Sequence, residues 1–430
     1  MTTTKNNEHK KLNFSSEREQ SQTCLNSAEH EKNQGRKVLN VPNLRFKEFQ
    51  GEWEKKSLGE IGESFIGLTY KPTDVVSEGG LIVFRSSNIQ NGCMDYKDIV
   101  RVNKNVKEKL ITKKDDLLVC ARNGSARLIG KNAILHEIDA NQTFGAFMMV
   151  FRSDINHFVH QLLNTRRYSS QVSENLGARI NQITSSDLSS FEFFFPRGNS
   201  EMNKIAALLD LLDERIATQN KIIDKLQSLI KGITQEVFND VGYRYKLGSI
   251  CEIKSGYSGN QLIKKEGLKV SRIETISGHR INLERVGYVS PFKNSESYKL
   301  QVGDILFSNI NSVEYIGNTA FVDKDYDLYH GMNLLRLIPN SKIVVPFYLY
   351  LLLNTRKMLN RFKTICNKAV SQASINQTDL GKTIIVLPSL ENQIKICTIY
   401  EVLFSKIEAE KKCLSLYNTQ KQYLLRQMFI

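Results

Sequence analysis

The sequence predicts an α+β protein in which a mixed α/β domain occurs twice, with a long helix after each copy. The pentapeptide LLNTR occurs at 162–166 and again at 352–356. Other matching residues follow in the same order, at a nearly constant offset of about 190 positions. Each copy then leads into a long segment of heptad-spaced apolar residues. The chain therefore reads as a tandem duplication with an internal pseudo-twofold relation.

These patterns divide the 430 residues into five segments. Residues 1–40 are rich in Lys, Glu, Asn, Gln and Ser, a composition that predicts a disordered tail. The ordered segments are a first domain at 41–199, a first helix at 200–240, a second domain at 241–389 and a second helix at 390–430.

Matches between the copies extend through both domains. They are short glycine, apolar and turn motifs of the kind that a shared scaffold requires. The pairs are Leu58-Gly59 with Leu247-Gly248, Val83 and Arg85 with Val270 and Arg272, Ile129-Gly130 with Ile316-Gly317, Gly145 with Gly331, Asp187-Leu188 with Asp379-Leu380, and Pro196 with Pro388.

The domains themselves have a mixed pattern. Runs rich in β-branched and aromatic residues predict strands, namely LIVFR, DLLVCA, AFMMVF and FEFFF in the first copy and GDILFS and TIIVL in the second. The segments around both LLNTR sequences predict helices. LLNTR should end a helical turn in each copy, which makes it scaffold and not chemistry.

The two long segments predict helices that pair with each other as an antiparallel coiled coil. Their apolar residues alternate at spacings of four and three, which places them on one seam. The seam residues are Ile205, Leu209, Leu212, Ile216, Ile223, Leu226 and Ile230 in the first helix, and Ile396, Leu403, Ile407, Leu414 and Leu424 in the second. Gln219 and Glu410 occupy the same layer, where a polar pair would fix the register. The alternative is that each helix packs separately on its own domain.

Charge and cysteine content restrict the functional class. The net charge is +14, and most of the positive excess lies in the two domains. Residues 41–199 contain 21 basic and 18 acidic residues, and residues 239–389 contain 20 basic and 12 acidic residues. This balance favours a polyanionic partner such as nucleic acid. The seven cysteines are scattered without a CxxC pair, which indicates reduced thiols in a cytosol. We expect neither a signal peptide nor a membrane span.

A search for catalytic motifs finds none that the duplication repeats. The segment GSARLIGKN (124–132) resembles a phosphate-binding loop but has the wrong spacing, so we interpret it as a turn. No Pro-Pro occurs, which excludes the motif of an adenine methyltransferase. The pair of histidines in HFVH (157–160) has no third metal ligand nearby and is interpreted as a helix face. We therefore expect no catalytic residue, no metal and no cofactor.

The sequence resembles the specificity subunits of type I restriction–modification systems over residues 41–430. The resemblance rests on VPNLRF followed by Trp53 and LGEI, and on the Ile-Gly and Asp-Leu-to-Pro signatures of each half. It also rests on the long helices that end in EVF (236–238) and QMF (427–429). Two departures from the family are the polar tail and Phe404, which stands where the first helix has Asp213.

The resemblance implies a non-catalytic subunit with two target-recognition domains separated by paired helices. Each domain would read one half of a bipartite, asymmetric double-stranded DNA site, and the helices would set the spacer. The implied partners are two methyltransferase subunits, which methylate adenine, and restriction subunits with ATP-dependent nuclease activity. The implied location is the cytoplasm.

Polar loops that correspond between the copies but differ in identity are the candidate DNA readers. Arg commonly contacts guanine, and Asn or Gln contacts adenine. The candidates are Arg85, Ser87, Asn88, Arg122, Asn123, Arg127, Arg179, Asn181 and Gln182 in the first copy, and Arg272, Glu274, Asn309, Asn311, Tyr315 and Gln372 in the second. Ordinary solvated loops, or loops that contact only phosphate, are the alternative. A non-catalytic structural scaffold and an orphan, inactive specificity subunit remain open as whole-protein alternatives.

Overall fold

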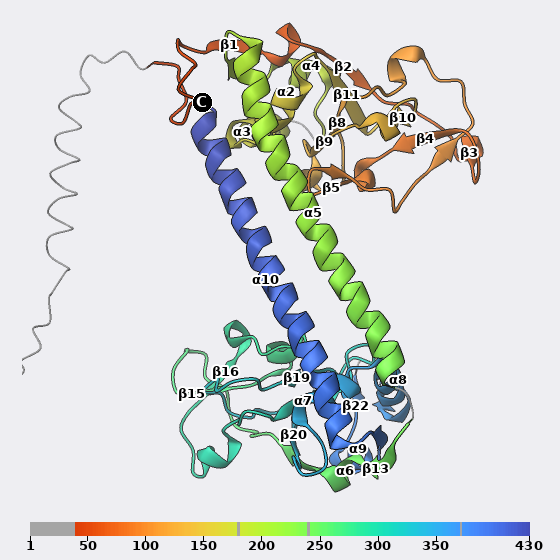
Figure 1. The fold of residues 1–430 in the computed structure, drawn as a ribbon, viewed down its shortest axis with the longest axis vertical. Coiled ribbons are helices and arrows are strands. Elements are labelled where there is room, and N and C mark those ends of the chain that lie inside the picture. Colours follow the sequence, from red (N-terminus) through yellow and green to blue (C-terminus); the bar gives the residue numbers. More distant parts are fainter. Residues whose placement is uncertain (1–38, 179–180, 239–240, 370–371) are drawn as a thin grey trace, which may run out of the picture. The chain divides into compact units, whose positions relative to one another are not determined.

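Two compact units make up the chain (Figure 1). The computed structural model describes residues 39–178, 181–238, 241–369 and 372–430. The first unit extends to Ala217 and adds Leu416–Ile430, and the second is Thr218–Ser415. Each unit therefore joins one α/β domain to segments of both long helices. The predicted disordered tail lies outside the described residues except for positions 39 and 40.

The first domain contains two four-stranded sheets and a two-stranded ribbon. The central sheet has the order β2 (Glu63–Ile66), β11 (Met148–Arg152), β8 (Leu117–Cys120) and β9 (Asn132–Ile134). The other sheet has the order β10 (Thr143–Phe144), β4 (Leu81–Phe84), β7 (Arg101–Val102) and β3 (Val75–Val76), and the ribbon pairs β1 (Glu54–Ser57) with β12 (Glu192–Phe195). A short hairpin joins β5 (Ile89–Gln90) to β6 (Cys93–Met94), and the helices are α2 (Asn156–Leu162), α3 (Arg166–Ala178) and α4 (Ser185–Ser190).

The second domain repeats this plan. Its central sheet has the order β14 (Cys251–Ser255), β20 (Leu334–Pro339), β17 (Ile305–Ser308) and β19 (Thr319–Phe321). Smaller sheets pair β13 (Tyr243–Lys246) with β23 (Ile384–Leu387), β15 (Leu268–Val270) with β16 (Gly287–Val289), and β18 (Ile310–Asn311) with β22 (Ala373–Ser374) and β21 (Asn367–Lys368). The helices are α6 (Leu247–Ile250), α7 (Pro346–Leu353), α8 (Arg356–Ile365) and α9 (Gln377–Gly381). The order of the central sheet is the same in both domains, and all six predicted strands are present.

LLNTR contains the end of one helix and the start of the next. In the first domain α2 ends at Leu162 and α3 begins at Arg166, and the Thr165 hydroxyl donates to the Leu162 carbonyl over 2.7 Å. In the second domain the Thr355 hydroxyl donates to Leu352 over 2.8 Å and caps the start of α8. The prediction that LLNTR ends a helical turn in each copy is confirmed, whereas the start of a second helix at its last residue was not predicted. A capping threonine starts a new helix there, because its hydroxyl replaces a backbone partner.

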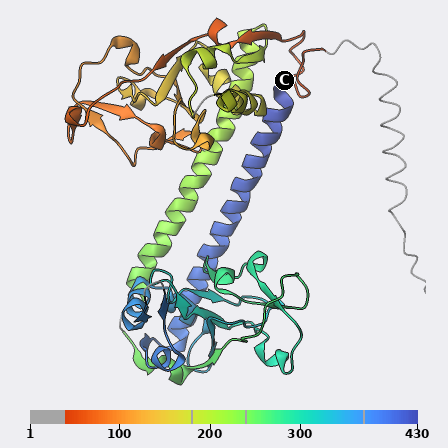
Figure 2. The ribbon, with the colours of Figure 1, turned by 180° about the vertical axis from the view of Figure 1, so that it is seen from behind.

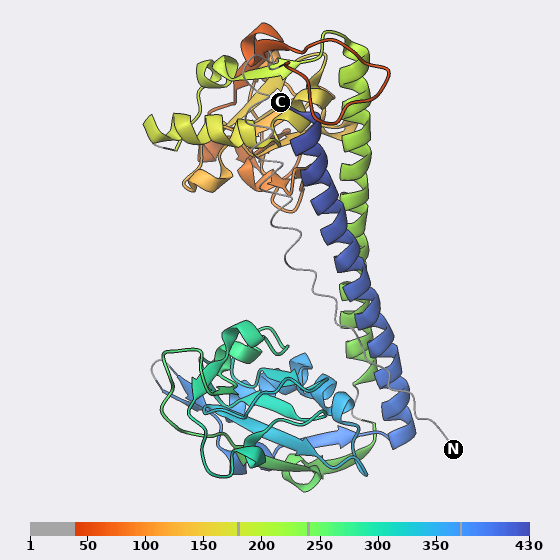
Figure 3. The ribbon, with the colours of Figure 1, turned by 90° about the vertical axis from the view of Figure 1, so that its left-hand side faces the viewer.

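The core of the first domain incorporates parts of both long helices, α5 (Asn199–Val237) and α10 (Leu390–Met428). Ile205 and Leu209 of α5 and Leu425 of α10 are buried in the same cluster as Trp53. Consequently, the C-terminus lies against the first domain, as Figures 2 and 3 also show. Burial of this apolar area anchors the helices to the domain.

The long helices pair with each other and run antiparallel. In the second unit the Gln219 side chain donates to the Glu410 carboxylate, and the Thr234 and Tyr400 hydroxyls lie 2.6 Å apart. The partner position on α10 falls as the position on α5 rises, which defines the antiparallel direction. The predicted polar layer of Gln219 and Glu410 is confirmed. Every seam residue predicted for the two helices is buried or half-buried.

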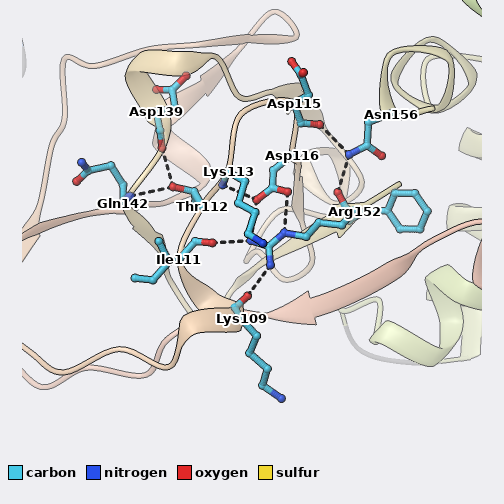
Figure 4. Close-up of polar contacts among 11 residues, drawn as sticks. Lys109, Ile111, Thr112, Lys113, Asp115, Asp116, Asp139, Gln142, Arg152 and Asn156 are labelled. Carbon is cyan, nitrogen blue, oxygen red and sulfur yellow. Dashed lines mark hydrogen bonds and ion pairs between the residues drawn. The ribbon is translucent and has the colours of Figure 1, made fainter. Parts of the chain in front are cut away.

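A buried ion pair lies at the end of β11, inside the first domain's central sheet (Figure 4). The Arg152 guanidinium donates to both carboxylate oxygens of Asp116, each over 2.8 Å. The same guanidinium donates to the carbonyls of Lys109 (3.1 Å) and Ile111 (2.5 Å). Arg152 on β11 thus ties the segment before β8 to the sheet. The second domain has a buried pair of the same type between Arg336 and Asp304, at 2.6 Å.

Candidate nucleic-acid interface

Three of the predicted loops of the first domain come together at one place. Arg122 forms an antiparallel bridge with Gln182, and the Asn123 amide donates to the Ser86 hydroxyl over 3.0 Å. The Asn181 amide donates to the Gly124 carbonyl over 3.3 Å. Contacts between residues 37 to 60 positions apart in sequence therefore build one surface, which we call the first loop cluster (85–88, 121–127 and 181–182). Arg179, also predicted here, lies outside the described residues.

Lys131 contacts the backbone of the first loop cluster, a role that was not predicted from the sequence. Its ammonium group donates to the carbonyls of Ser86 and Ile89, the latter over 2.9 Å. Burial lowers the pKa of Lys131. The lysine is thus a structural cation that fixes the backbone of 86–89.

Asn88 has a structural role of the same kind. Its side chain is 0% exposed; its amide donates to the carbonyls of Asp95 and Asp98 and its oxygen accepts from the Arg85 backbone. The amide has no hydrogen-bonding group left to present, so the geometry argues against the predicted base contact by Asn88. The Arg85 guanidinium lies 2.7 Å from the Asp98 carboxylate. Ser87 is half-buried beside it, and Arg127 is exposed.

An exposed aromatic ring lies within reach of the first loop cluster. Phe147 is 58% exposed, and the Arg122 guanidinium lies over its ring at 5.3 Å from the centroid. The backbone amides of Ala121 and Arg122 both donate to the Phe147 carbonyl at 3.0 Å. A guanidinium held over a ring offers donors for a base edge or phosphate together with an apolar face for a thymine methyl or a base. No sequence pattern marks this ring as exposed, because Phe147 stands inside a run that predicts a strand.

The second domain also brings its predicted loops together. Strand β18, which contains Asn311, pairs with β22 immediately after Gln372. The Asn309 amide donates to the Ile375 carbonyl over 3.4 Å, and Tyr315 is 50% exposed. These segments form the second loop cluster (308–315 and 372–374). Gln372 is exposed.

The remaining predicted segment of the second domain, 271–275, lies in the turn that precedes and begins a 3-10 helix at Ile273–Ile276. Arg272 pairs with Glu274 at 3.5 Å, and both side chains are largely exposed. The Ser271 hydroxyl, in contrast, is buried and accepts from the backbone of Gly331 over 3.0 Å. Arg272 and Glu274 therefore present charged groups on a turn that the buried serine holds in place.

The same backbone hydrogen bond supports both clusters. The Ile183 amide donates to the Ala121 carbonyl over 2.8 Å, and the Ile375 amide donates to the Asn309 carbonyl over 2.9 Å. One residue further along each loop, Arg122 faces Gln182 in the first domain, whereas Ile310 faces Ser374 in the second. The frame is thus retained while the side chains that it presents differ.

The described residues contain neither a metal-ligand cluster nor a membrane-spanning helix. In the part of the chain that the structure describes, no group of three or more His, Cys, Asp and Glu side chains is placed to hold a metal ion. None of the described helices is both long and apolar enough to span a membrane. The histidines of HFVH face helix α5 and Asn132, with His157 2.5 Å from Asp210 and His160 2.9 Å from Asn132. They belong to the attachment of the domain to the helix.

Comparison with known proteins identifies the family. The family model described as "Type I restriction modification DNA specificity domain" matches this chain twice, at residues 50–228 and 243–415. The chain belongs to this family. It is a specificity subunit of a type I restriction–modification system, with two DNA-recognition domains. The resemblance inferred from the sequence is confirmed.

Individual relatives agree with the family assignment. The putative MjaX specificity subunit of Methanocaldococcus jannaschii is 41% identical over 180 residues, which cover 41% of this chain and 42% of that protein. The EcoKI specificity subunit of Escherichia coli is 24% identical over 398 residues, covering 84% of this chain and 85% of that protein. The MjaX match thus spans less than half of that relative, whereas the EcoKI match includes most of both chains.

Solved structures share the fold. The S subunit from M. genitalium superposes with a TM-score of 0.60 at 17% identity, covering 91% of this chain and 99% of that one. A second solved chain has a TM-score of 0.51 at 17% identity, covering 87% of this chain and 96% of that one. It comes from work on complex assembly and conformational transition of the type I R-M system. The predicted α+β fold, with two tandem domains and two long antiparallel helices, is confirmed.

Proposed function

We propose that the first and second loop clusters each read one half of a bipartite, asymmetric DNA target. The observation that carries this proposal is the shared hydrogen-bond frame, Ile183 to Ala121 and Ile375 to Asn309, which presents different side chains in the two domains. A frame common to both domains would place each cluster alike on DNA, while different side chains would select different bases. A target with two unlike halves follows from this arrangement.

The chemistry of each cluster suits base reading in a major groove. In the first cluster, Arg122 supplies the donors that suit guanine, and Gln182 opposite it supplies the donor and acceptor that suit adenine. In the second cluster, Gln372 supplies an exposed amide and Tyr315 an exposed ring with a hydroxyl. The Asn311 amide already donates to the Ser308 hydroxyl and accepts from the Ser312 backbone. The excess of basic residues in both domains would add sequence-independent attraction to phosphate.

The long helices would serve as the spacer between half-sites and as the docking surface for two methyltransferase subunits. Beyond the paired seam, α5 exposes Leu211 (56%) and Leu229 (50%), and α10 exposes Ile394 (55%), Val402 (63%) and Leu416 (59%). Exposed large apolar residues in rows on a helix typically mark protein contact. Adenine methylation and ATP-dependent cleavage would then belong to the methyltransferase and restriction subunits, in the cytoplasm. A purely structural scaffold is not favoured.

The test measures DNA binding by the complex of this chain with its methyltransferase, using duplexes that carry the target or one altered half. We expect Arg122→Ala to reduce discrimination in one half-site by about tenfold to a hundredfold, equivalent to roughly 1–3 kcal/mol. Arg197→Ala is the matched control, because Arg197 is also an exposed arginine but lies outside both clusters. The control should weaken all duplexes alike and only slightly. If Arg122→Ala lowered affinity for every duplex by the same factor, base reading by this cluster would be refuted.

A further inference from the structure

The first domain meets the long helices through a polar junction. The His157 ring lies 2.5 Å from one carboxylate oxygen of Asp210, and the Gln161 amide donates to the other over 2.8 Å. The same amide donates to Asp213 over 2.9 Å, and Lys421 of α10 pairs with Asp213 at 2.5 Å. We call His157, Gln161, Asp210, Asp213 and Lys421 the polar junction. It joins α2, α5 and α10 within the first unit.

The side chains of this junction are largely buried, so their polar groups need hydrogen-bond or ion-pair partners within the protein. Gln161 is 0% exposed, and the Lys421 side chain is only 13% exposed. Neighbouring His160 is 6% exposed, and burial lowers its pKa to about 4, so its ring is neutral at pH 7. Buried polar and charged groups are tolerated only with their partners in place. Each half of the junction therefore requires the other.

The second domain meets the same helices through an apolar junction. Alignment on the two LLNTR sequences places Phe347 and Leu351 of α7 where α2 has His157 and Gln161. On the helices, the offset of 191 that relates Gln219 to Glu410 places Phe404 at the position of Asp213 and Ile230 at that of Lys421. Four of the five polar positions are thus replaced by apolar side chains. The fifth position, Asp210, corresponds to Glu401, which is exposed.

Ring contacts in the second unit show that Phe347 of α7 and Phe404 of α10 meet. The rings of Phe347 and Phe404 pack edge-to-face with centroids 6.3 Å apart, and Phe404 also contacts Tyr400 at 6.0 Å. Tyr400 lies opposite Thr234 of α5, so one helical turn further along the antiparallel pair Ile230 lies opposite Phe404. The departure of Phe404 from the first helix therefore belongs to a matched substitution of four of the five junction positions.

We propose that the two junctions form a docking code that assigns each recognition domain to its own segments of the helices. A first domain seated on Phe404 and Ile230 would bury the amide of Gln161 without a partner. A second domain seated on Asp213 and Asp210 would bury carboxylates against Phe347. Either mismatch is costly, whereas the matched seatings are not. With the function proposed above, the code would also fix which half-site each end of the helices carries.

The test converts the polar junction to the apolar type one side at a time, in the full chain. His157→Phe with Gln161→Leu changes the domain side, and Asp213→Phe with Lys421→Ile changes the helix side. Each side alone should lower the denaturation midpoint reported by Trp53, which lies in the same unit. The four changes together should recover most of that loss, because they recreate the chemistry of the second junction. Strictly additive losses, or no loss from either side, would overturn the code.

A milder cycle keeps the test measurable if the apolar changes prevent folding. Asp213→Asn and Lys421→Met each remove one charge of the pair and leave the amide of Gln161 an acceptor at position 213. The double variant should cost clearly less than the two single variants added together, and an additive result would again contradict the proposal. Neither cycle uses DNA. Failure of the docking code is thus separate from failure of the proposed reading of half-sites.

Discussion

Replacing Arg152 by Met should destabilise the first unit while leaving the second unit intact. The substitution removes two hydrogen bonds to Asp116 and those to the carbonyls of Lys109 and Ile111 (Figure 4). The Asp116 carboxylate then retains only the backbone amide of Lys113, at 2.8 Å. That carboxylate is 3% exposed, so water cannot replace the lost guanidinium.

The expected cost follows from this burial. Removing one partner of a buried ion pair costs about 3–5 kcal/mol, chiefly because the remaining charge is left without compensation. The double variant Arg152→Met with Asp116→Asn should recover part of this cost, since it leaves a neutral amide in place of a buried charge. Arg152→Lys should fall between the wild type and Arg152→Met. Its single ammonium cannot reproduce the bidentate pair.

The chain provides its own site-specific probe. Its only tryptophan, Trp53, is 2% exposed and packs against Phe158 and Phe429 in the core of the first unit. Tryptophan fluorescence during urea denaturation therefore follows the unfolding of this unit. The free energy is obtained by linear extrapolation for each variant.

A matched control is available in the second unit. Arg336→Met breaks the buried pair with Asp304 and should leave the Trp53 transition unchanged. The reasoning is refuted if Arg152→Met lowers the free energy of unfolding by less than about 1 kcal/mol, or if Arg336→Met shifts the Trp53 transition as much as Arg152→Met.

Three further predictions concern the second unit. Burial lowers the folded-state pKa of His330 to about 4. The stability that its neutral ring contributes is therefore present above pH 6.5 and falls by about 2 kcal/mol between pH 7 and pH 5. Hydrogen exchange in this domain should show the loss, and a His330→Asn variant with the same pH dependence would contradict the prediction. Gly317→Ala should lower the free energy of unfolding by about 2 kcal/mol or more, because φ is +85° and the new Cβ would lie 2.5 Å from the buried ring of Phe362. Thermal denaturation measures this loss, and the control Gly278→Ala, which has open space around its Cβ, should be nearly neutral. Gln219→Leu alone should lower the thermal midpoint of the helix pair, since Glu410 would face an apolar side chain, and adding Glu410→Leu should restore it; a further decrease in the double variant would count against the polar layer.

The features that were predictable from the sequence are those written in local or periodic patterns. The duplication was visible because matched motifs recur at one offset, and the helices because heptad spacing persists through both. The pairing of Gln219 with Glu410 followed from their common layer. The break inside LLNTR was missed because a threonine cap changes one turn without disturbing the apolar pattern around it.

The loop clusters show where such prediction ends. Residue type pointed to Arg122 and Gln182, which the fold brings together, but it also pointed to Asn88, whose side-chain amide already forms hydrogen bonds within its own turn. Phe147 looked like a strand interior, and only the tertiary fold turns its ring outward. Contacts between distant segments decide which polar side chains are free, and a single sequence does not encode those contacts in a local pattern.

The central claim is that this chain directs methylation to a bipartite target, one half for each domain. The most direct test is single-molecule methylome sequencing of the host with the gene intact, deleted, and carrying Arg122→Ala. We predict that an asymmetric bipartite N6-methyladenine motif disappears on deletion and that the Arg122 variant relaxes bases in only one of its halves. A methylome that is unchanged on deletion would contradict the claim.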